Sequence, residues 1–420
     1  MRRSRVVSGV LAGLVLGAGA LPGSTAEASP EPRSWVGSWA GAPEPAALSG
    51  PSREGFANRT VRMVVHSSLA GERARVRLSN LYGDRPLRVG HAALAQAGKG
   101  AASGPQRELT FGGRRQVTIP PGRELYSDPV RFAVKASEDV VVSVYLPAAT
   151  GPATWHWESR QTSYVSEAGD HSTDRDGGAF GGRVDSWFFL TGLDVLSRGA
   201  RGSVVVLGDS ITDGVGSTPN AHRRWTDRLN ERLARSYGAR RPAVLNAGIA
   251  SNRVLKPGGE LGYPEWGESG LDRFARDVAG QTGVRKTILA LGVNDIHIPP
   301  GSSAADLIAG LRDIAARSHR RGMPIAVATV TPFENNAYGT YTPQREAVRR
   351  QVNTYLRHSR DFDALIDFDA VVRDPRHPSR IRPEFDSGDS LHPNDAGYRA
   401  MADQVPLHWL TRTVPAATTH

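Results

Sequence analysis

The chain has 420 residues, a formal net charge of +10 and no cysteine. A chain of this length can bury a large core and typically forms two domains. The absence of cysteine excludes disulfide bonds, thiolate nucleophiles and zinc sites with cysteine ligands.

The first 28 residues have the pattern of a secretory signal peptide. An arginine-rich start precedes an apolar, glycine-rich run over 6–21, and Ala26-Glu27-Ala28 fits a cleavage site before Ser29. A membrane anchor is the weaker interpretation, because the run is short and a spanning helix needs about 20 apolar residues. We therefore expect a secreted mature chain without a transmembrane segment.

The positive charge comes almost entirely from arginine. It would allow transient contact with anionic lipid or cell-envelope surfaces. A general arginine bias over every face is the simpler explanation, since no dense basic run follows the signal segment. The chain has no nucleic-acid-binding motif, so no nucleic-acid partner is expected.

Residues 35–195 are predicted to form a β-rich domain. Short alternating or β-branched runs are separated by Gly, Pro and Asp turns, which is typical of a β-sandwich or a jelly-roll-like module. The predicted strands include 60–66, 73–79, 116–119, 130–134 and 140–146. Within this domain, Trp155-His156-Trp157 is either a surface that stacks on sugars or a packing element, and packing is the commoner role of such aromatics.

Residues 200–412 are predicted to form a second, α/β domain. Apolar strands alternate here with amphipathic helices, which predicts a doubly wound sheet of five parallel strands. The predicted strands are 203–207, 243–246, 286–291, 324–330 and 364–368. The predicted helices have apolar faces formed by Trp225, Leu229 and Leu233, by Leu307, Leu311 and Ile314, and by Val348, Val352 and Tyr355, the last preceded by Thr342 as a cap.

Polar side chains and a glycine follow three of these strands. Ser210 follows the first strand in Gly208-Asp209-Ser210-Ile211, Gly248 follows the second, and Asn294 follows the third in Gly292-Val293-Asn294-Asp295. The carboxyl ends of parallel strands meet at one edge of a sheet, where function concentrates. A hydroxyl, a glycine backbone and an amide are therefore expected at one edge.

A fourth motif, Asp389-Ser390-Leu391-His392, lies beyond the fifth strand. An acid three residues before a histidine lets both side chains emerge from one turn. The carboxylate can then hold the Nδ1 hydrogen while Nε2 points outward. A serine within roughly 3 Å of Nε2 would complete a nucleophile, a base and an orienting acid.

In this order, the four motifs resemble the signature blocks of the SGNH, or GDSL, hydrolase superfamily over about residues 203–410. The surrounding sequence resembles secreted bacterial GDSL-like lipases and acylhydrolases that carry an N-terminal β-rich domain. That subgroup includes phospholipases and relatives of carbohydrate acetylesterases. The resemblance implies a flavodoxin-like five-stranded sheet and hydrolysis of carboxylic esters.

The resemblance also implies a role for each residue. Ser210 would be the nucleophile, His392 the general base and acid, and Asp389 its orienting partner. The Ser210 and Gly248 backbone N–H groups and the Asn294 side chain would form the oxyanion hole, since fixed donors stabilise a tetrahedral oxyanion. No cofactor or metal is expected, because zinc, phosphate-loop and dinucleotide motifs are absent from the sequence.

Taken singly, these residues have structural interpretations. Ser210 could cap a helix, Asn294 could sit in a turn, and His392 and Asp389 could be a surface histidine and a capping acid. Other polar residues are predicted to be structural or solvated. They are the histidines His222, His319, His358 and His377, and the acids Asp213, Asp295, Asp386 and Asp395, which fit loop-stabilising positions.

Two long connections, 252–270 and 333–342, either overhang Ser210 and shape specificity or pack on the β-rich domain. The expected function is that of a lipase- or phospholipase-type acylhydrolase. The alternative within ester hydrolysis is removal of O-acetyl groups from a carbohydrate. A non-catalytic envelope or glycan-binding protein is the alternative from another class.

Overall fold

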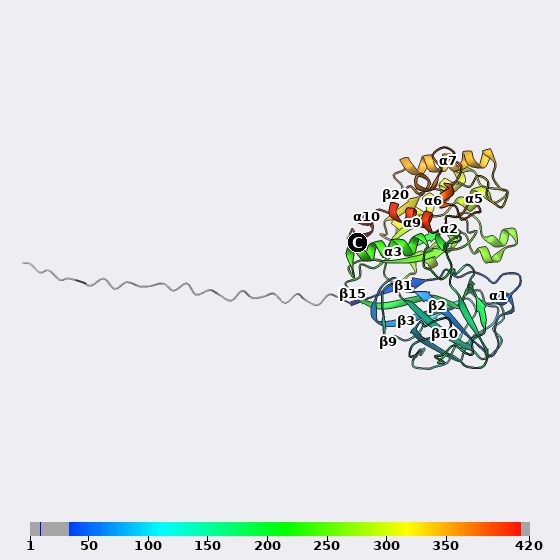
Figure 1. The fold of residues 1–420 in the computed structure, drawn as a ribbon, viewed down its shortest axis with the longest axis vertical. Helices are drawn as coiled ribbons and strands as arrows, with labels where there is room; N and C mark the ends of the chain where they lie inside the picture. Colours follow the sequence, from blue (N-terminus) through cyan, green and yellow to red (C-terminus); the bar gives the residue numbers. More distant parts are fainter. Residues whose placement is uncertain (1–8, 10–32, 413–420) are drawn as a thin grey trace, which may run out of the picture. The chain divides into compact units, whose positions relative to one another are not determined.

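The computed structural model describes Gly9 and residues 33–412. The predicted signal segment, 1–28, therefore lies outside the described residues except for Gly9. From Arg33 onward, the described residues belong to one compact unit. It contains an antiparallel β-rich part, drawn blue to green in Figure 1, and an α/β part, drawn green to red.

The β-rich part contains two main antiparallel sheets. The first has the order β1-β15-β3-β8, with β9 also paired to β3, and the second has the order β13-β12-β2-β10-β5-β6. The first sheet consists of β1 (Arg33–Ala40), β3 (Gly71–Asn80), β8 (Arg123–Tyr126), β9 (Val130–Val134) and β15 (Leu190–Arg198). The second consists of β2 (Arg59–His66), β5 (His91–Gln96), β6 (Arg107–Glu108), β10 (Asp139–Leu146), β12 (Ser163–Ala168) and β13 (Gly182–Val184).

Alternation of side chains along β2 and β10 places one face of the second sheet in the core. Met63 is paired with Val142 in the register, and both side chains are fully buried in the main apolar cluster. Their neighbours Val64 and Val141 point to the other face and form a small separate cluster with Ala95. Shorter elements complete this part: α1 (Pro51–Glu54), β4 (Leu87–Val89), β7 (Val117–Ile119), β11 (Trp155–His156) and β14 (Trp187–Phe188).

The α/β part contains a five-stranded parallel sheet in the order β17-β16-β18-β19-β20. Its strands are β16 (Ser203–Gly208), β17 (Ala243–Gly248), β18 (Val284–Ala290), β19 (Ile325–Ala328) and β20 (Ala364–Ile366). In the register, Gly208 of the central strand is paired with Gly248 on one side and Ala290 on the other. Three strands therefore end level with one another, and the loops that follow them begin at one edge.

The helices of the α/β part bury most of the apolar faces that the sequence predicts, although Val348 and Tyr355 are only half-buried. Trp225, Leu229 and Leu233 are fully buried on one helix, and the Thr342 hydroxyl accepts a hydrogen bond from the Arg345 N–H at the start of another. The helices are α2 (Ser210–Asp213), α3 (Trp225–Tyr237), α4 (Gly270–Phe274), α5 (Val293–His297), α6 (Ala304–His319), α7 (Pro343–His358), α8 (Phe368–Val372), α9 (Asp395–Gln404) and α10 (Leu407–Thr411). Short 3-10 or π turns are η1 (Gly258–Leu261), η2 (Pro264–Trp266), η3 (Ala275–Ala279) and η4 (Pro383–Phe385). Among the described residues, no helix combines the length and the apolar character needed to cross a membrane.

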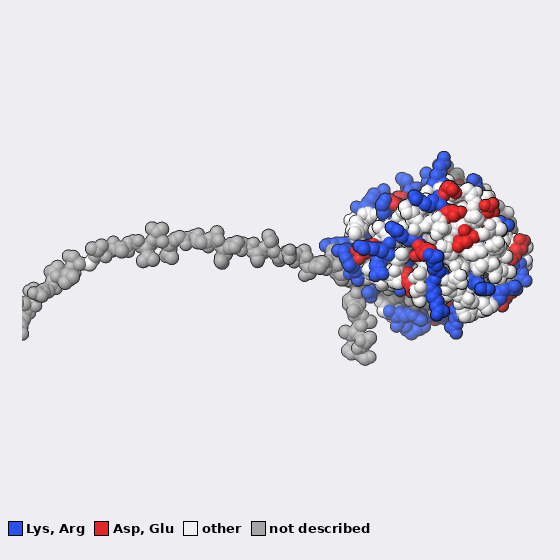
Figure 2. Space-filling model, turned by 90° about the horizontal axis from the view of Figure 1, so that it is seen from below, with Lys and Arg blue, Asp and Glu red and all other residues white. Residues whose placement is uncertain are grey.

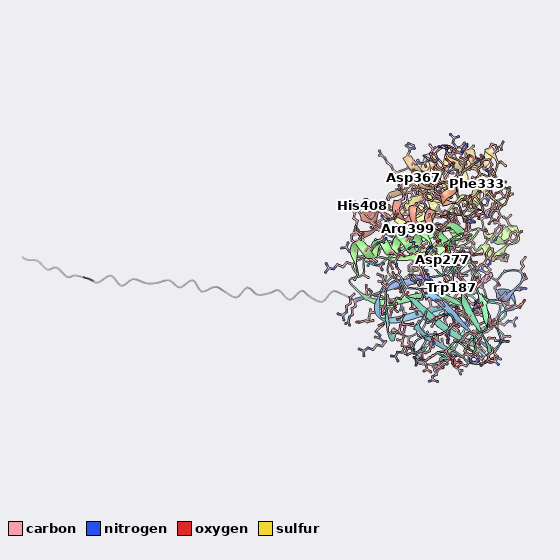
Figure 3. The ribbon with its side chains drawn as sticks, viewed as in Figure 1. Trp187, Asp277, Phe333, Asp367, Arg399 and His408 are labelled. Atoms are coloured by element: carbon pink, nitrogen blue, oxygen red, sulfur yellow. The ribbon has the colours of Figure 1, made fainter. Side chains whose placement is uncertain are left out.

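The β-rich part packs directly on the parallel sheet. The Gly37 N–H of β1 donates to the Thr282 carbonyl, and a Cβ at Gly37 would come within 2.8 Å of Leu245 in β17. Ser68 donates its hydroxyl to Asn230 of α3 and accepts from the Val244 N–H. Figure 3 labels Trp187 on the β-rich side of this boundary and Asp277 on the α/β side.

His156 of the Trp155-His156-Trp157 segment links the two parts at this boundary. Its ring is buried against Trp187, its Nδ1 lies 3.1 Å from Glu44, and its Nε2 lies 3.0 Å from Asp213 in α2. The segment therefore has the packing role, and Asp213 anchors the helix that begins with Ser210.

Burial and charge set the protonation of this cluster. Burial alone would lower the pKa of His156, but the charges and hydrogen bonds of Asp213 and Glu44 outweigh it and raise that pKa well above its usual value. Burial raises the pKa of Glu44 to about 7, against the lowering effect of His156. A raised pKa in the folded protein means that stability is lost as the pH rises through that value.

Glu44→Gln is expected to weaken the pH dependence of stability. Glu44 contributes stability that is fully present below its ordinary pKa of 4.5 and is lost as the pH rises through about 7. The free energy of unfolding of the wild type, measured in urea between pH 5 and pH 9, should fall more steeply than that of the variant. Equal slopes would contradict the protonation assigned to this cluster. Glu231→Gln, at a partly exposed helical pair, is the control and should leave the slope unchanged.

Candidate active site

Ser210 occupies the first position of α2, directly after the central strand β16. The preceding Asp209 caps this short helix, because its carboxylate accepts a hydrogen bond of 3.0 Å from the Ile211 N–H. Burial raises the pKa of Asp209 to about 7, and its hydrogen bonds are with the helix start. Because Gly208 has no side chain, the end of β16 can lie close to Thr212 of α2. A Cβ at position 208 would lie 2.1 Å from the Thr212 hydroxyl. The Ser210 side chain thus emerges at the sheet edge, and the residue is 5% exposed.

The structure brings Ser210, His392 and Asp389 together. His392 Nε2 lies 2.8 Å from Ser210 Oγ, and His392 Nδ1 lies 2.5 Å from one carboxylate oxygen of Asp389. The other Asp389 oxygen accepts the backbone N–H groups of Leu391 and His392. One carboxylate therefore both closes the turn and orients the imidazole, as the spacing of the motif predicts.

The environment of Asp389 keeps its carboxyl ionised. Burial would raise its pKa, but the hydrogen bond and charge of His392 and the two backbone donors lower the pKa to about 2. The loop itself is held by Asp386, which accepts the Gly388 and Ser390 N–H groups. Because an ionised carboxylate only accepts, it leaves the His392 hydrogen on Nδ1 and the Nε2 lone pair free to face Ser210.

Asn294, near the start of α5, is held by two neighbours. Its Nδ2 donates 2.9 Å to the Asn252 carbonyl, and its Oδ1 lies 2.8 Å from Nε2 of His297. Burial, followed by the positive charges of His392 and Arg345, lowers the pKa of His297 to about 4. A neutral His297 therefore donates from Nε2 to Oδ1, which leaves one of the two Nδ2 hydrogens of Asn294 without a partner among the described residues.

The prediction that the Gly248 N–H belongs to the oxyanion hole does not fit the structure. Its single backbone hydrogen is donated to Asn246 Oδ1 at 2.8 Å, so in this arrangement it is not available to an oxyanion. Glycine is required at this position for a different, steric reason. A Cβ at position 248 would lie 2.5 Å from the Asp213 backbone nitrogen. Gly248 lets the end of β17 approach α2.

The part of the chain that forms this edge matches the model of a known protein family. Residues 206–400 match the model of the GDSL-like Lipase/Acylhydrolase family, and this range includes Ser210, Gly248, Asn294, Asp389 and His392. Residues 206–400 are a GDSL-like lipase/acylhydrolase domain. The chain therefore carries the domain of a hydrolase that acts on esters.

Solved structures similar to this chain include three proteins that align with about half of it. A G-D-S-L family protein from Desulfitobacterium hafniense is 19% identical, with 48% of this chain and 96% of that chain covered and a TM-score of 0.35. A GDSL-like lipase from Bacteroides thetaiotaomicron is 16% identical, with 48% and 84% covered and a TM-score of 0.35. The lipase/acylhydrolase from Enterococcus faecalis is 19% identical, with 48% and 92% covered and a TM-score of 0.38. No curated protein matches the chain significantly.

Two residues of the GDSL-like domain near this edge were not predicted from the sequence. Ser251, three residues after β17, has a φ of 61°, which is unusual for a residue other than glycine. Among the hydrogen bonds of residues 33–412, none has the Ser210 or Ser251 backbone N–H as its donor. Arg273 is fully buried and donates to the Gly208 carbonyl, the Ala247 carbonyl and the Asn252 side chain.

The segment 333–342 lies against the loop that carries Asp389. The Ala337 N–H donates 2.9 Å to the Asp389 carbonyl, and Thr340 Oγ1 lies 2.9 Å from His297 Nδ1. Tyr338 is 60% exposed, and burial of its hydroxyl and the charges of Asp389 and Glu158 raise its pKa. An aromatic side chain therefore lies at the rim of the site.

The remaining polar residues from the sequence analysis have partners. Asp295 accepts the Val254 and Leu255 N–H groups, and Asp395 accepts from Thr218. His222, however, lies beside an acid, Asp139, that is far away in the sequence. His319 pairs with Asp363, His377 lies near Asp374, and His358 bonds the Thr354 carbonyl.

His297→Ala is expected to lower kcat roughly 10- to 100-fold with little change in KM, because Asn294 would lose the partner that fixes its amide. The measurement is steady-state hydrolysis of a short aryl ester. His297→Gln should retain more activity, since its amide can donate to Asn294. His358→Ala is the control and should match the wild type. An unchanged kcat in His297→Ala would refute the positioning role.

Proposed function

We propose that Ser210, His392 and Asp389 are the catalytic triad of a serine carboxylester hydrolase. The observation that carries this proposal is the chain of two hydrogen bonds, 2.8 Å between Ser210 and His392 and 2.5 Å between His392 and Asp389. A nucleophile within reach of a base, and a base held by an acid, is the arrangement that activates a serine hydroxyl. It also argues against the alternative of a non-catalytic binding protein.

The proposed reaction has two acyl-transfer steps. Ser210 Oγ attacks the ester carbonyl while His392 Nε2 takes the hydroxyl proton, and the tetrahedral intermediate collapses when Nε2 returns that proton to the leaving alcohol. Water then attacks the acyl-enzyme by the same route and releases the acid. Asp389 stays ionised throughout, since its pKa is about 2, and stabilises the imidazolium that forms in each step.

The oxyanion of each intermediate needs fixed donors. We assign the Ser210 N–H, at the start of α2, and the free Nδ2 hydrogen of Asn294 to this role. The Ser251 N–H takes the place that the sequence analysis gave to Gly248. Two observations support this: Ser251 has a positive φ three residues beyond the strand end, and its N–H is not used by another group among residues 33–412.

For the substrate, we propose an acyl ester of a lipid or phospholipid. The exposed Tyr338 and Tyr263 rings support it, because they offer apolar surface, and Tyr263 stacks on Trp266 with ring centroids 4.2 Å apart. The same rings could stack on a sugar, so removal of carbohydrate O-acetyl groups is the second candidate. Incubation with phosphatidylcholine, lysophospholipid, triglyceride and acetylated xylan distinguishes them. Fatty acid without acetate supports the lipid, and acetate alone overturns it.

We also propose a secreted protein, on the signal-like pattern of 1–28. On the face seen in Figure 2, Lys and Arg side chains occur on every side with Asp and Glu between them. On this face, the spread favours a general arginine bias over a dedicated anionic-surface site, and we propose that any contact with anionic lipids is transient.

For the architecture, we infer that the sheet is doubly wound and that the two antiparallel sheets form a sandwich. The chain passes from β16 to β17 in one direction and then through β18, β19 and β20 in the other. Right-handed crossovers would place α3 on one face and α4, α6 and α7 on the other. The contacts of α3 with α9, and of α6 with α4 and α7, support this grouping.

Ser210→Ala is expected to abolish ester hydrolysis above background, and Asn294→Ala to lower kcat by about two to three orders of magnitude with the fold retained. The measurement is turnover of a short aryl ester, with urea unfolding as the check on folding. Ser217→Ala, a buried serine that bonds a backbone carbonyl, is the matched control and should keep its turnover. Normal turnover in Ser210→Ala would remove Ser210 from the mechanism.

A further inference from the structure

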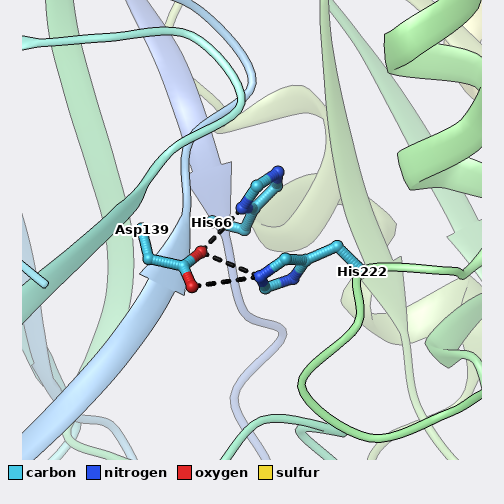
Figure 4. A group of neighbouring side chains, drawn as sticks. All are labelled: His66, Asp139 and His222. Atoms are coloured by element: carbon cyan, nitrogen blue, oxygen red, sulfur yellow. Dashed lines mark hydrogen bonds and ion pairs between the residues drawn. The ribbon is translucent and has the colours of Figure 1, made fainter. Parts of the chain in front are cut away.

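Two histidines and an aspartate from separate segments meet where the β-rich part contacts the α/β part. His66 ends β2, Asp139 begins β10, and the two residues are paired in the register of the second sheet. His222 belongs to the connection between α2 and α3 and has a φ of 49°. Figure 4 shows both imidazole rings directed at the same carboxylate.

The distances are those of potential ligands to one ion. His66 Nδ1 lies 2.7 Å and His222 Nε2 lies 2.9 Å from the same oxygen of Asp139. One ligand atom from each residue can be chosen so that all three lie within 4.8 Å of one another. Because a carboxylate only accepts, each of these nitrogens carries a hydrogen in the arrangement seen. The rings are stacked, with centroids 3.7 Å apart.

Room for additional ligands lies beside the cluster. His66 and His222 both line a cavity of about 50 Å³, which also includes Asp213 and Gln161. One oxygen of Asp213 and the Gln161 side-chain oxygen are buried there without a hydrogen-bond partner among the described residues. Since a water needs roughly 10–15 Å³, the cavity has space for several waters.

We propose that His66, Asp139 and His222 form a binding site for a zinc-type divalent ion. The ligands are His66 Nδ1, His222 Nε2 and one Asp139 oxygen, and water from the cavity completes the coordination. Two imidazoles and one carboxylate match the ligand preference of Zn²⁺ and its neighbours, whereas Ca²⁺ and Mg²⁺ prefer oxygen ligands only. Each ring binds the ion as the neutral tautomer whose single hydrogen lies on the nitrogen facing away from Asp139. The hydrogens that now face Asp139 therefore leave as protons to solvent, and a ring that is neutral before binding takes up a proton from solvent on its other nitrogen.

Such an ion would crosslink the two parts of the chain. His66 and Asp139 come from the β-rich part, and His222 comes from the connection 214–224. That connection also binds the start of α9, through Thr218 and Arg223 to Asp395, three residues after His392. The site therefore lies outside the catalytic triad, and its ion would stabilise the connection that supports the triad.

The test uses the full chain, purified without a histidine tag and stripped with a chelator, and measures binding of ZnCl2 by calorimetry. We expect one saturable equivalent and a rise in the thermal unfolding midpoint of about 5 °C at saturating zinc. Asp139→Asn and His222→Gln should lose both effects. His319→Gln, which removes a histidine paired with only one acid, is the matched control and should keep both.

Two further measurements keep the test decisive. Co²⁺ added to the wild type should produce visible absorption that zinc abolishes, which needs no variant to fold. His222→Gln should retain ester hydrolysis, which shows that it is folded, because His222 is not part of the triad. Absence of a saturable zinc equivalent, equal zinc binding by wild type and His222→Gln, or binding of CaCl2 in place of zinc would each overturn the proposal.

Discussion

The candidate site depends on one buried guanidinium. Arg273 donates to the carbonyls of Gly208 and Ala247 at the ends of β16 and β17, to the side chain of Asn252, and to Asp277. A buried charge is tolerated only when its donors are satisfied, so these groups are constrained to lie around one point. Arg273 therefore fixes the position of the strand that leads to Ser210 relative to the turn that contains Ser251.

The β-rich part contributes to the same constraint from the other side. His156 reaches Asp213 at the end of the helix that begins with Ser210, so α2 is held at both ends. Segment 333–342 bonds the Asp389 loop through Ala337. The β-rich part therefore contacts, through His156, the helix that carries the proposed nucleophile.

The sequence predicted features that depend on local pattern, and it failed where distant side chains meet. Periodicity located β16, β17 and the buried face of α3, and the spacing of Asp389 and His392 predicted their contact. Local pattern could not show that Asp139, 83 residues before His222, lies beside it. That contact depends on how separate segments pack, and a single sequence carries no signal for it. The bond from the Gly248 N–H to Asn246 is local, but it depends on the side-chain conformation of Asn246 at the strand end, which the motif does not specify. The positive φ of Ser251 was likewise hidden, since serine is not a residue that indicates such a backbone.

The most direct test of the central claim is covalent labelling with a fluorophosphonate, followed by mass spectrometry of the digested chain. An activated serine attacks the phosphorus, displaces fluoride and stays phosphonylated, whereas an ordinary hydroxyl reacts far more slowly. The account predicts one adduct per chain, on Ser210, and much slower labelling in Asp389→Asn. An adduct on another residue, or ester hydrolysis that persists after Ser210 is fully labelled, would contradict it.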